Sequence, residues 1–141
     1  MADCIFCSII AGEAPASIIY EDEQVIALMD IMPVNPGHVL IVPKKHCATL
    51  GDLDEATGVH VFRVGMRIER ALRQADLRCE GTNLLQNNGR AAMQEIFHVH
   101  LHVIPRYRGD SLRFSYDRRG REPEELEQTA ELLRRELSAP S

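Results

Sequence analysis

The chain lacks a long hydrophobic run. No apolar stretch among its 141 residues approaches the roughly 20 residues that a membrane-spanning helix needs. It also lacks the basic start and apolar stretch of a signal peptide, because it begins Met-Ala-Asp-Cys. These two absences predict a protein with no membrane partner, located in the cytoplasm.

An excess of positive charge is missing as well. Lys and Arg number 16 against 21 Asp and Glu, which gives a net charge of −5. Surfaces that bind nucleic acid are normally basic, so no nucleic-acid partner is expected. The four cysteines are too irregularly spaced for a secreted disulfide framework. In a cytoplasmic chain, the pair Cys4-x-x-Cys7 instead indicates metal binding or redox chemistry.

Apolar periodicity predicts an α+β fold. We expect helices at residues 3–10 (capped by Asp3), at 54–76 and from Pro123 onward, and strands at 17–20, 24–29, 38–42, 82–86 and 98–104. Short turns between strands indicate an antiparallel five-stranded sheet, accompanied by one long helix, a short N-terminal helix and a C-terminal helix. No repeat or linker interrupts the pattern, so residues 1–141 are predicted to form a single domain.

Three histidines alternate with apolar residues in His98-Val99-His100-Leu101-His102. In a strand this alternation places all three imidazoles on one face. Two chemistries suit such a face. In the first, Cys4, Cys7 and two of the six histidines bind a metal, although spacing alone does not select which two.

The second chemistry is phosphate transfer. A neutral imidazole attacks phosphorus as a nucleophile, and a second imidazole stabilises the phosphate oxygens. The turn Asn87-Asn88-Gly89 adds amide donors, and its glycine permits close approach of the backbone. The two chemistries are compatible with each other.

The alternating histidines resemble the signature of the histidine triad family, and other segments resemble that family in the same order. These segments are Phe6–Glu13, Asp30–His38 and Pro43–His46, followed by Gln94 upstream of the triad. The resemblance covers a core of about residues 3–107 and leaves a C-terminal excursion and helix at 108–141. It is closest to the bacterial nucleotide-binding branch of the family.

This resemblance implies roles for individual residues. His100 matches the nucleophile that attacks the α-phosphorus of a nucleotide, and His102 and His38 match histidines that contact the phosphate. Further positions match residues around the base, ribose and phosphate: Phe6, Ile9, Leu28, Asp30, Ile31, Leu40, Asn87 and Gln94. Members of this branch with an N-terminal Cys-x-x-Cys bind structural zinc, and the matching ligands here are Cys4, Cys7, His46 and His98.

The function implied by the resemblance is that of a hydrolase or transferase acting through a nucleotidyl-histidine intermediate. Its substrates would be purine nucleotides, as nucleoside phosphoramidates or dinucleoside polyphosphates, and the protein would be a homodimer joined through its long helices and sheets. The alternative is a nucleotide-binding adaptor or sensor with incidental catalysis. A purely structural zinc module is disfavoured because it would leave His100, His102 and His38 unused.

Glu95 departs from the family pattern. Many histidine triad hydrolases carry Ser or Thr directly after the glutamine, whereas here Gln94 precedes Glu95. A carboxylate beside a phosphate is repelled unless it points away, is protonated or meets a cationic leaving group. We therefore hypothesise an amine leaving group, as in a phosphoramidate.

Overall fold

The structure is a computed structural model that describes residues 3–140. The chain divides into two compact units, one ending at Ser111 and the other beginning at Leu112. The boundary lies inside the predicted C-terminal excursion.

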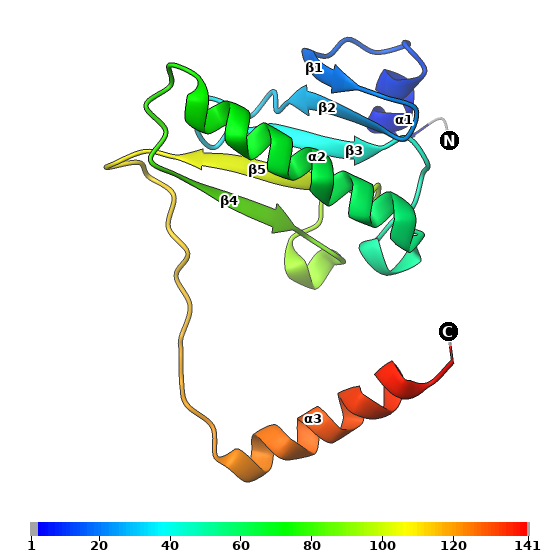
Figure 1. Cartoon of the computed structure of the whole chain (residues 1–141), viewed down its shortest axis with the longest axis vertical. Coiled ribbons are helices and arrows are strands. Elements are labelled where there is room, and N and C mark those ends of the chain that lie inside the picture. The colour runs from blue at the N-terminus through cyan, green and yellow to red at the C-terminus, as the bar shows by residue number, and fades with distance from the viewer. Residues whose placement is uncertain (1–2, 141) are drawn as a thin grey trace. The chain divides into compact units, whose positions relative to one another are not determined.

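The first unit contains a five-stranded sheet in the order β1-β2-β3-β5-β4, with every neighbouring pair antiparallel (Figure 1). The strands are β1 (Ile18–Glu21), β2 (Val25–Met29), β3 (Val39–Pro43), β4 (Gly81–Gln86) and β5 (Leu101–Arg106). The α-helices of the chain are α1 (Ile5–Ile10), α2 (Glu55–Gln74) and α3 (Pro123–Ser138), and short 3-10 helices span Leu50–Asp52 and Arg90–Ala92. The predicted α+β fold with an antiparallel five-stranded sheet is confirmed.

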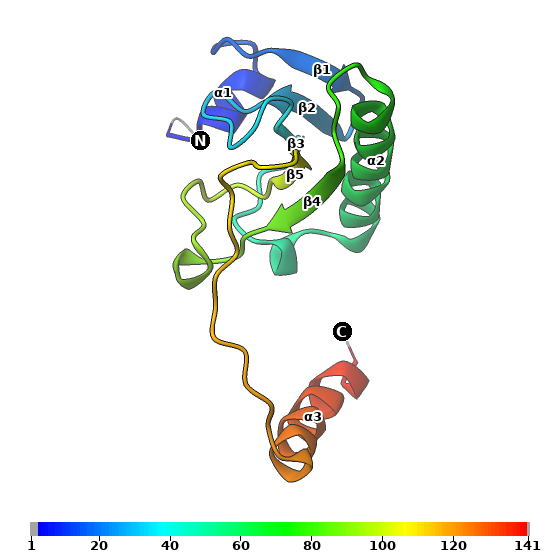
Figure 2. The same ribbon diagram turned by 90° about the vertical axis from the view of Figure 1, so that its left-hand side faces the viewer.

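The two faces of the sheet carry different helices, as the view along the sheet in Figure 2 shows. Along β2, Val25 and Ala27 pack with the α2 core, whereas Ile26 and Leu28 pack with α1 on the opposite face. This alternation follows from the two-residue period of a strand. The α2 core is the larger of the two clusters, and it contains no residue of α1.

Helix α1 is only six residues long and depends on its surroundings. Its N-cap is Cys4, whose Sγ accepts a hydrogen bond from the Cys7 N–H at 3.5 Å. The prediction that Asp3 caps this helix is therefore wrong by one residue. The helix ends before Gly12, whose φ of +77° is readily adopted by glycine.

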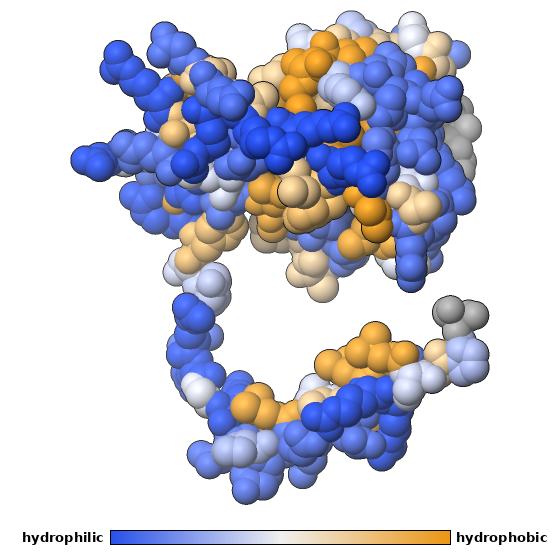
Figure 3. Space-filling model, in the orientation of Figure 1, coloured by the Kyte–Doolittle hydropathy of each residue, from blue (hydrophilic) through white to orange (hydrophobic). Residues whose placement is uncertain are grey.

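Helix α2 buries one side and exposes apolar residues on the other. Asp54 caps it, and its buried stripe includes the predicted Val61, Val64, Ile68 and Leu72. Val59, Phe62 and Met66 are each at least half exposed and line a shallow groove that also contains Leu50 and Leu53. Apolar surface of this kind is visible among charged side chains in Figure 3.

The histidine-bearing strand begins later than predicted. We expected a strand at residues 98–104, but β5 starts at Leu101 and continues through Pro105 to Arg106. His98 and His100 precede it, because the carbonyl of His98 accepts from the His100 imidazole and the Val99 N–H donates to the Cys47 carbonyl. These bonds replace the regular ladder, and only His102 of the triad lies in the strand.

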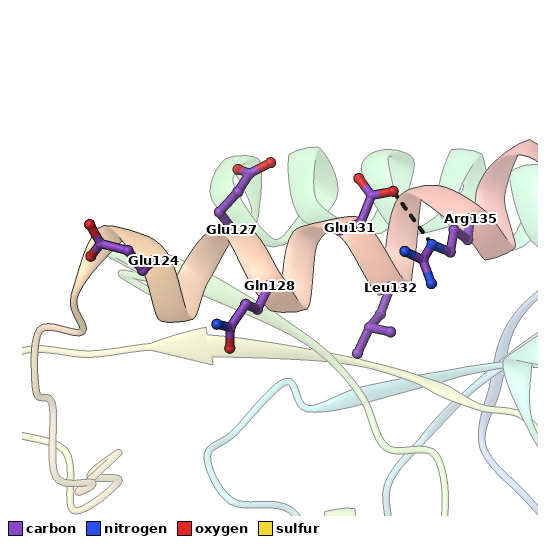
Figure 4. Close-up of a pocket in the computed structure, with 6 residues that line it drawn as sticks. All are labelled: Glu124, Glu127, Gln128, Glu131, Leu132 and Arg135. Atoms are coloured by element: carbon purple, nitrogen blue, oxygen red, sulfur yellow. Dashed lines mark hydrogen bonds and ion pairs between the residues drawn. The ribbon is translucent and has the colours of Figure 1, made fainter.

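The second unit consists of an extended segment and the amphipathic helix α3. No residue of α3 is buried, and Leu126, Leu132, Leu133 and Leu137 are each more than half exposed. Figure 3 shows apolar side chains along part of this helix. Figure 4 shows Glu131 beside Arg135, whose Nε lies 3.4 Å from the carboxylate. No helix within residues 3–140 is both long and apolar enough to cross a membrane.

Candidate functional site

Four predicted metal ligands converge where α1 meets the chain just after β3 and just before β5. The Sγ of Cys4 lies 3.3 Å from Nδ1 of His98, and the Sγ of Cys7 lies 3.4 Å from Nδ1 of His46. The two Nδ1 atoms are 3.1 Å apart. All four ligand atoms lie within 4.8 Å of one another, so a single ion could contact them together.

The protonation pattern of this cluster suits a divalent metal. The Nε2–H of the fully buried His98 donates to the carbonyl of Pro43 at 2.7 Å, which leaves the lone pair of Nδ1 facing the thiols. Burial lowers the pKa of His98 and so favours this neutral form. Burial and the neighbouring Cys4 raise the pKa of Cys7. A cation at the centre would offset the cost of two adjacent thiolates, and two sulfurs with two nitrogens are typical zinc ligands.

The central histidine presents a free nitrogen lone pair. The Nδ1 of His100 lies 2.7 Å from the carbonyl oxygen of His98, and a carbonyl only accepts, so Nδ1 carries the proton. The Nε2 atom of a neutral His100 therefore holds the lone pair. The ring lies between those of Phe6 and His102, with centroid distances of 5.1 and 4.9 Å. His100 thus has the tautomer and the support that a nucleophile requires.

A hydrogen-bonded chain orients the other two phosphate-contacting candidates. The N–H of Val34 donates to Nδ1 of His38 at 3.1 Å, so the proton of His38 sits on Nε2. That Nε2–H donates to Nδ1 of His102 at 2.9 Å. The remaining proton of His102 is consequently on its Nε2, where it is available to a phosphate oxygen. Asp30 lies 3.5 Å from Nε2 of His38 and supports the same orientation.

The same chain makes a second metal site unfavourable. Asp30, His38 and His102 bring three potential ligand atoms together. A metal on Nε2 of neutral His38 would require its proton on Nδ1, where it would oppose the N–H of Val34. The Cys/His cluster meets no such conflict. The hydrogen-bond pattern therefore favours a metal at the Cys/His cluster, whereas His38 and His102 carry protons on Nε2 and act as hydrogen-bond donors.

The partly buried His102 makes the stability of the fold depend on pH. Burial, assisted by His100 and His38, lowers the pKa of His102 from 6.5 to about 4, although Asp30 opposes the shift. The folded state therefore binds fewer protons than the unfolded chain between these two values. His102 alone should therefore lower the free energy of unfolding by about 2 kcal/mol as the pH drops from 7 to 5, and its contribution should be recovered as the pH rises above 6.5.

Urea denaturation at pH 7 and pH 5 measures this effect. The variant His102→Gln should lose less stability over the same interval, because its side chain does not titrate. Equal pH dependence in the two proteins would contradict the assignment.

The predicted base-contacting residues form one apolar cluster. Phe6, Ile9, Leu28 and Leu40 are all buried, and they pack together with Ile26 and Val42, which the sequence analysis did not single out. Ile31 lies outside this cluster and is 89% exposed, so its contact with a nucleotide stays a prediction. The cluster borders the catalytic candidates through Phe6, which touches the ring of His100.

Gln94 holds the loop before the triad in place. Its Oε1 accepts from the N–H of Gly89 at 2.7 Å, and its Nε2 donates to the carbonyls of Ala48 and Ile96. The side chain is buried and engages both ends of its amide within the protein. Gln94 thus shapes the loop that carries Asn87. Direct contacts of Gln94 and Asn87 with a nucleotide stay predictions.

Glu95 is exposed, in contrast to the buried side chain of its neighbour Gln94. It lines a surface groove with Asp3, Phe97 and the metal-ligand candidates Cys4 and His46. Glu95 therefore borders the same groove as two of the candidate metal ligands.

Comparison with known proteins places this geometry in a family. The HIT domain model matches residues 11–109. A zinc-bound histidine triad protein of Mycobacterium smegmatis is 41% identical, covers 98% of this chain and 99% of its own, and superposes with a TM-score of 0.77. A histidine triad nucleotide-binding protein of Candida albicans is 33% identical, with 96% and 98% covered and a TM-score of 0.86.

A curated relative adds an activity to this comparison. The adenylylsulfatase HINT3 of Arabidopsis thaliana is 41% identical over 110 residues, which cover 78% of this chain and 55% of that protein. The family model, these likenesses and the His98-x-His100-x-His102 geometry agree with one another, and the chain therefore belongs to the histidine triad family.

Proposed function

We propose that the protein is a nucleotide hydrolase or transferase that cleaves at the α-phosphate through a nucleotidyl-His100 intermediate. The observation that carries this proposal is the hydrogen bond from Nδ1–H of His100 to the carbonyl of His98, which leaves the Nε2 lone pair free. The adenylylsulfatase relative acts, by its name, on an adenylyl compound and supports the substrate class.

The proposed cycle has two displacements at phosphorus. In the first, Nε2 of His100 forms a bond to the α-phosphorus, and the bond from phosphorus to the leaving group breaks with its electron pair. The leaving group takes up a proton. In the second, water attacks the phosphorus, loses a proton and breaks the nitrogen–phosphorus bond. A nucleoside monophosphate departs, and His100 returns to its neutral form.

The neighbouring histidines stabilise charge during both displacements. The Nε2–H of His102 donates to a phosphate oxygen, and the chain through His38 to the Val34 N–H keeps that donor pointing outward. The apolar cluster around Phe6 and Leu40 receives the base, and Asp30 accepts from the ribose hydroxyls. Cys4, Cys7, His46 and His98 would hold zinc, which with four protein ligands would fix α1 structurally.

Mass spectrometry of the intact protein tests this proposal. After brief incubation with an adenosine phosphoramidate or diadenosine polyphosphate, and quenching in an alkaline denaturant that preserves the acid-labile phosphorus–nitrogen bond, we expect an adenylyl adduct on His100. The phosphoramidate arm also addresses the amine leaving group hypothesised from Glu95. Binding of AMP without any adduct or turnover would contradict the proposed enzyme and favour the nucleotide-binding adaptor.

We also propose that the protein is a homodimer joined through α2. The exposed Val59, Phe62 and Met66 form an apolar surface that association with a second copy would bury. Phe62→Glu should convert the dimer to a monomer in sedimentation velocity, because it places a charge in this surface. Ile19→Glu, at a similarly exposed position on β1, is the matched control and should stay dimeric. A monomeric unsubstituted protein would contradict the proposal.

A further inference from the structure

Helix α1 and its N-cap supply side chains both to the group of candidate metal ligands and to the proposed nucleotide pocket. Cys4 and Cys7 supply two of the candidate ligands, and Phe6 lies between them in the sequence. The ring of Phe6 lies 5.7 Å from that of His98 and 5.1 Å from that of His100. One aromatic side chain thus touches both a metal-ligand candidate and the proposed nucleophile.

His98 forms a second connection between the two sites. Its side chain enters the metal cluster through Nδ1, and its Nε2–H is tied to Pro43. Its main-chain carbonyl accepts the Nδ1–H of His100. A change among the candidate metal ligands that shifts His98 therefore also moves the carbonyl of His98. This carbonyl is the group that fixes the tautomer of His100.

Helix α1 also depends on a metal bound at the Cys/His cluster to hold it against the sheet. Six residues are too few for a helix to persist on its own in water. The core on the opposite face of the sheet is built from α2 and the strands and contains none of the residues of α1. Loss of the metal would therefore loosen α1 while leaving the main core assembled.

We propose that metal occupancy and nucleotide affinity are thermodynamically coupled in this protein through Phe6 and His98. This inference rests on the proposed function, because it takes the pocket beside His100 as the nucleotide site. Metal held by Cys4, Cys7, His46 and His98 stabilises the wall of the pocket and so strengthens nucleotide binding. By reciprocity, bound nucleotide strengthens metal binding by the same factor.

Calorimetric titration with AMP tests the coupling in one direction. The full chain loaded with zinc should bind AMP at least about fivefold more tightly than the same chain after chelation, which is the lower end of common coupling strengths. Competition for zinc with a chromophoric chelator tests the other direction. Saturating AMP should lower the zinc dissociation constant by the same factor. Circular dichroism should show a folded metal-free protein.

Phe6→Leu separates the coupling from metal binding itself. This variant keeps an apolar side chain but loses the ring that joins His98 to His100, so zinc affinity should stay within about twofold while the coupling factor falls toward one. Cys79→Ala is the control, since Cys79 donates to the Gly81 carbonyl and belongs to neither site, and this variant should keep the full coupling.

Each outcome separates the inference from the function on which it rests. Equal AMP affinities with and without zinc would overturn the coupling and leave the nucleotide site intact. A metal-free chain that is wholly unfolded would also overturn it, because the loss of AMP binding would then reflect global unfolding. Failure of the zinc-loaded protein to bind AMP would contradict the proposed function itself.

Discussion

Replacing His100 by alanine is expected to lower kcat/KM for a nucleotide substrate by at least about 10⁴-fold. This loss is the size seen when a covalent nucleophile is removed, because no other group takes over the bond to phosphorus. Zinc content should change little, since the side chain of His100 is not one of the four clustered ligand candidates. AMP affinity should also change little, because the proposed contacts of His102 and of the apolar cluster with the nucleotide would remain. Steady-state kinetics, metal analysis and calorimetry measure the three quantities.

The control for this substitution replaces a histidine outside the triad, and it is expected to leave activity unchanged. His60 lies on α2 and bonds to Asp22 at 2.6 Å, outside the triad, so His60→Ala should keep kcat/KM within a few-fold of the unsubstituted protein. Added imidazole should partly restore turnover in His100→Ala by occupying the vacated space. Turnover near that of the unsubstituted protein in His100→Ala would refute the role of His100 as nucleophile.

Removal of metal is expected to lower the melting temperature by roughly 10 °C. Without an ion, Cys4 and Cys7 no longer hold α1 against the sheet, and the buried Phe6 and Ile9 become exposed. Burial of two such side chains contributes about 2 kcal/mol each, so the loss approaches 4 kcal/mol in a chain of this length. Thermal melts of zinc-loaded and chelated protein, followed by circular dichroism, measure the shift.

The double variant Cys4→Ser/Cys7→Ser distinguishes metal loss from other effects of the chelator. It should melt near the temperature of the chelated protein and should not respond to further chelation. A chelator that lowers the melting temperature of both proteins equally would show that the destabilisation arises elsewhere.

Much of the fold could be predicted because its signals are local. Apolar periodicity located α2 from its buried stripe, and nearly continuous apolar runs located β2 and β3, whose residues the structure buries on both faces of the sheet. The start of β5 was missed because the His98 carbonyl is occupied by the nearby His100 side chain and the Val99 N–H by the distant Cys47 carbonyl, and neither bond has a signature in the sequence. The cap of α1 was missed because a thiol replaced the usual oxygen acceptor.

The candidate site was predictable as a set of residues but not as an arrangement. Spacing alone did not connect His46 and His98 with the cysteines, and the family resemblance supplied that connection. The structure brings these side chains within reach of one ion. The backbone groups that fix the tautomers of His38 and His100 carry no signature in the sequence, because every residue except proline offers the same N–H and carbonyl.

The hydrogen bond from Val34 to His38 has a consequence for the loop that precedes β3. Prolines occupy positions 33 and 36 and restrict the backbone there, yet position 34 must keep its N–H, because that donor, with Asp30 at the other side of the ring, sets the polarity of the imidazole chain. A proline at 34 would leave every side chain of the triad unchanged. It would nevertheless allow His38 to flip its proton to Nδ1, so that His102 would meet the phosphate with a lone pair instead of a proton.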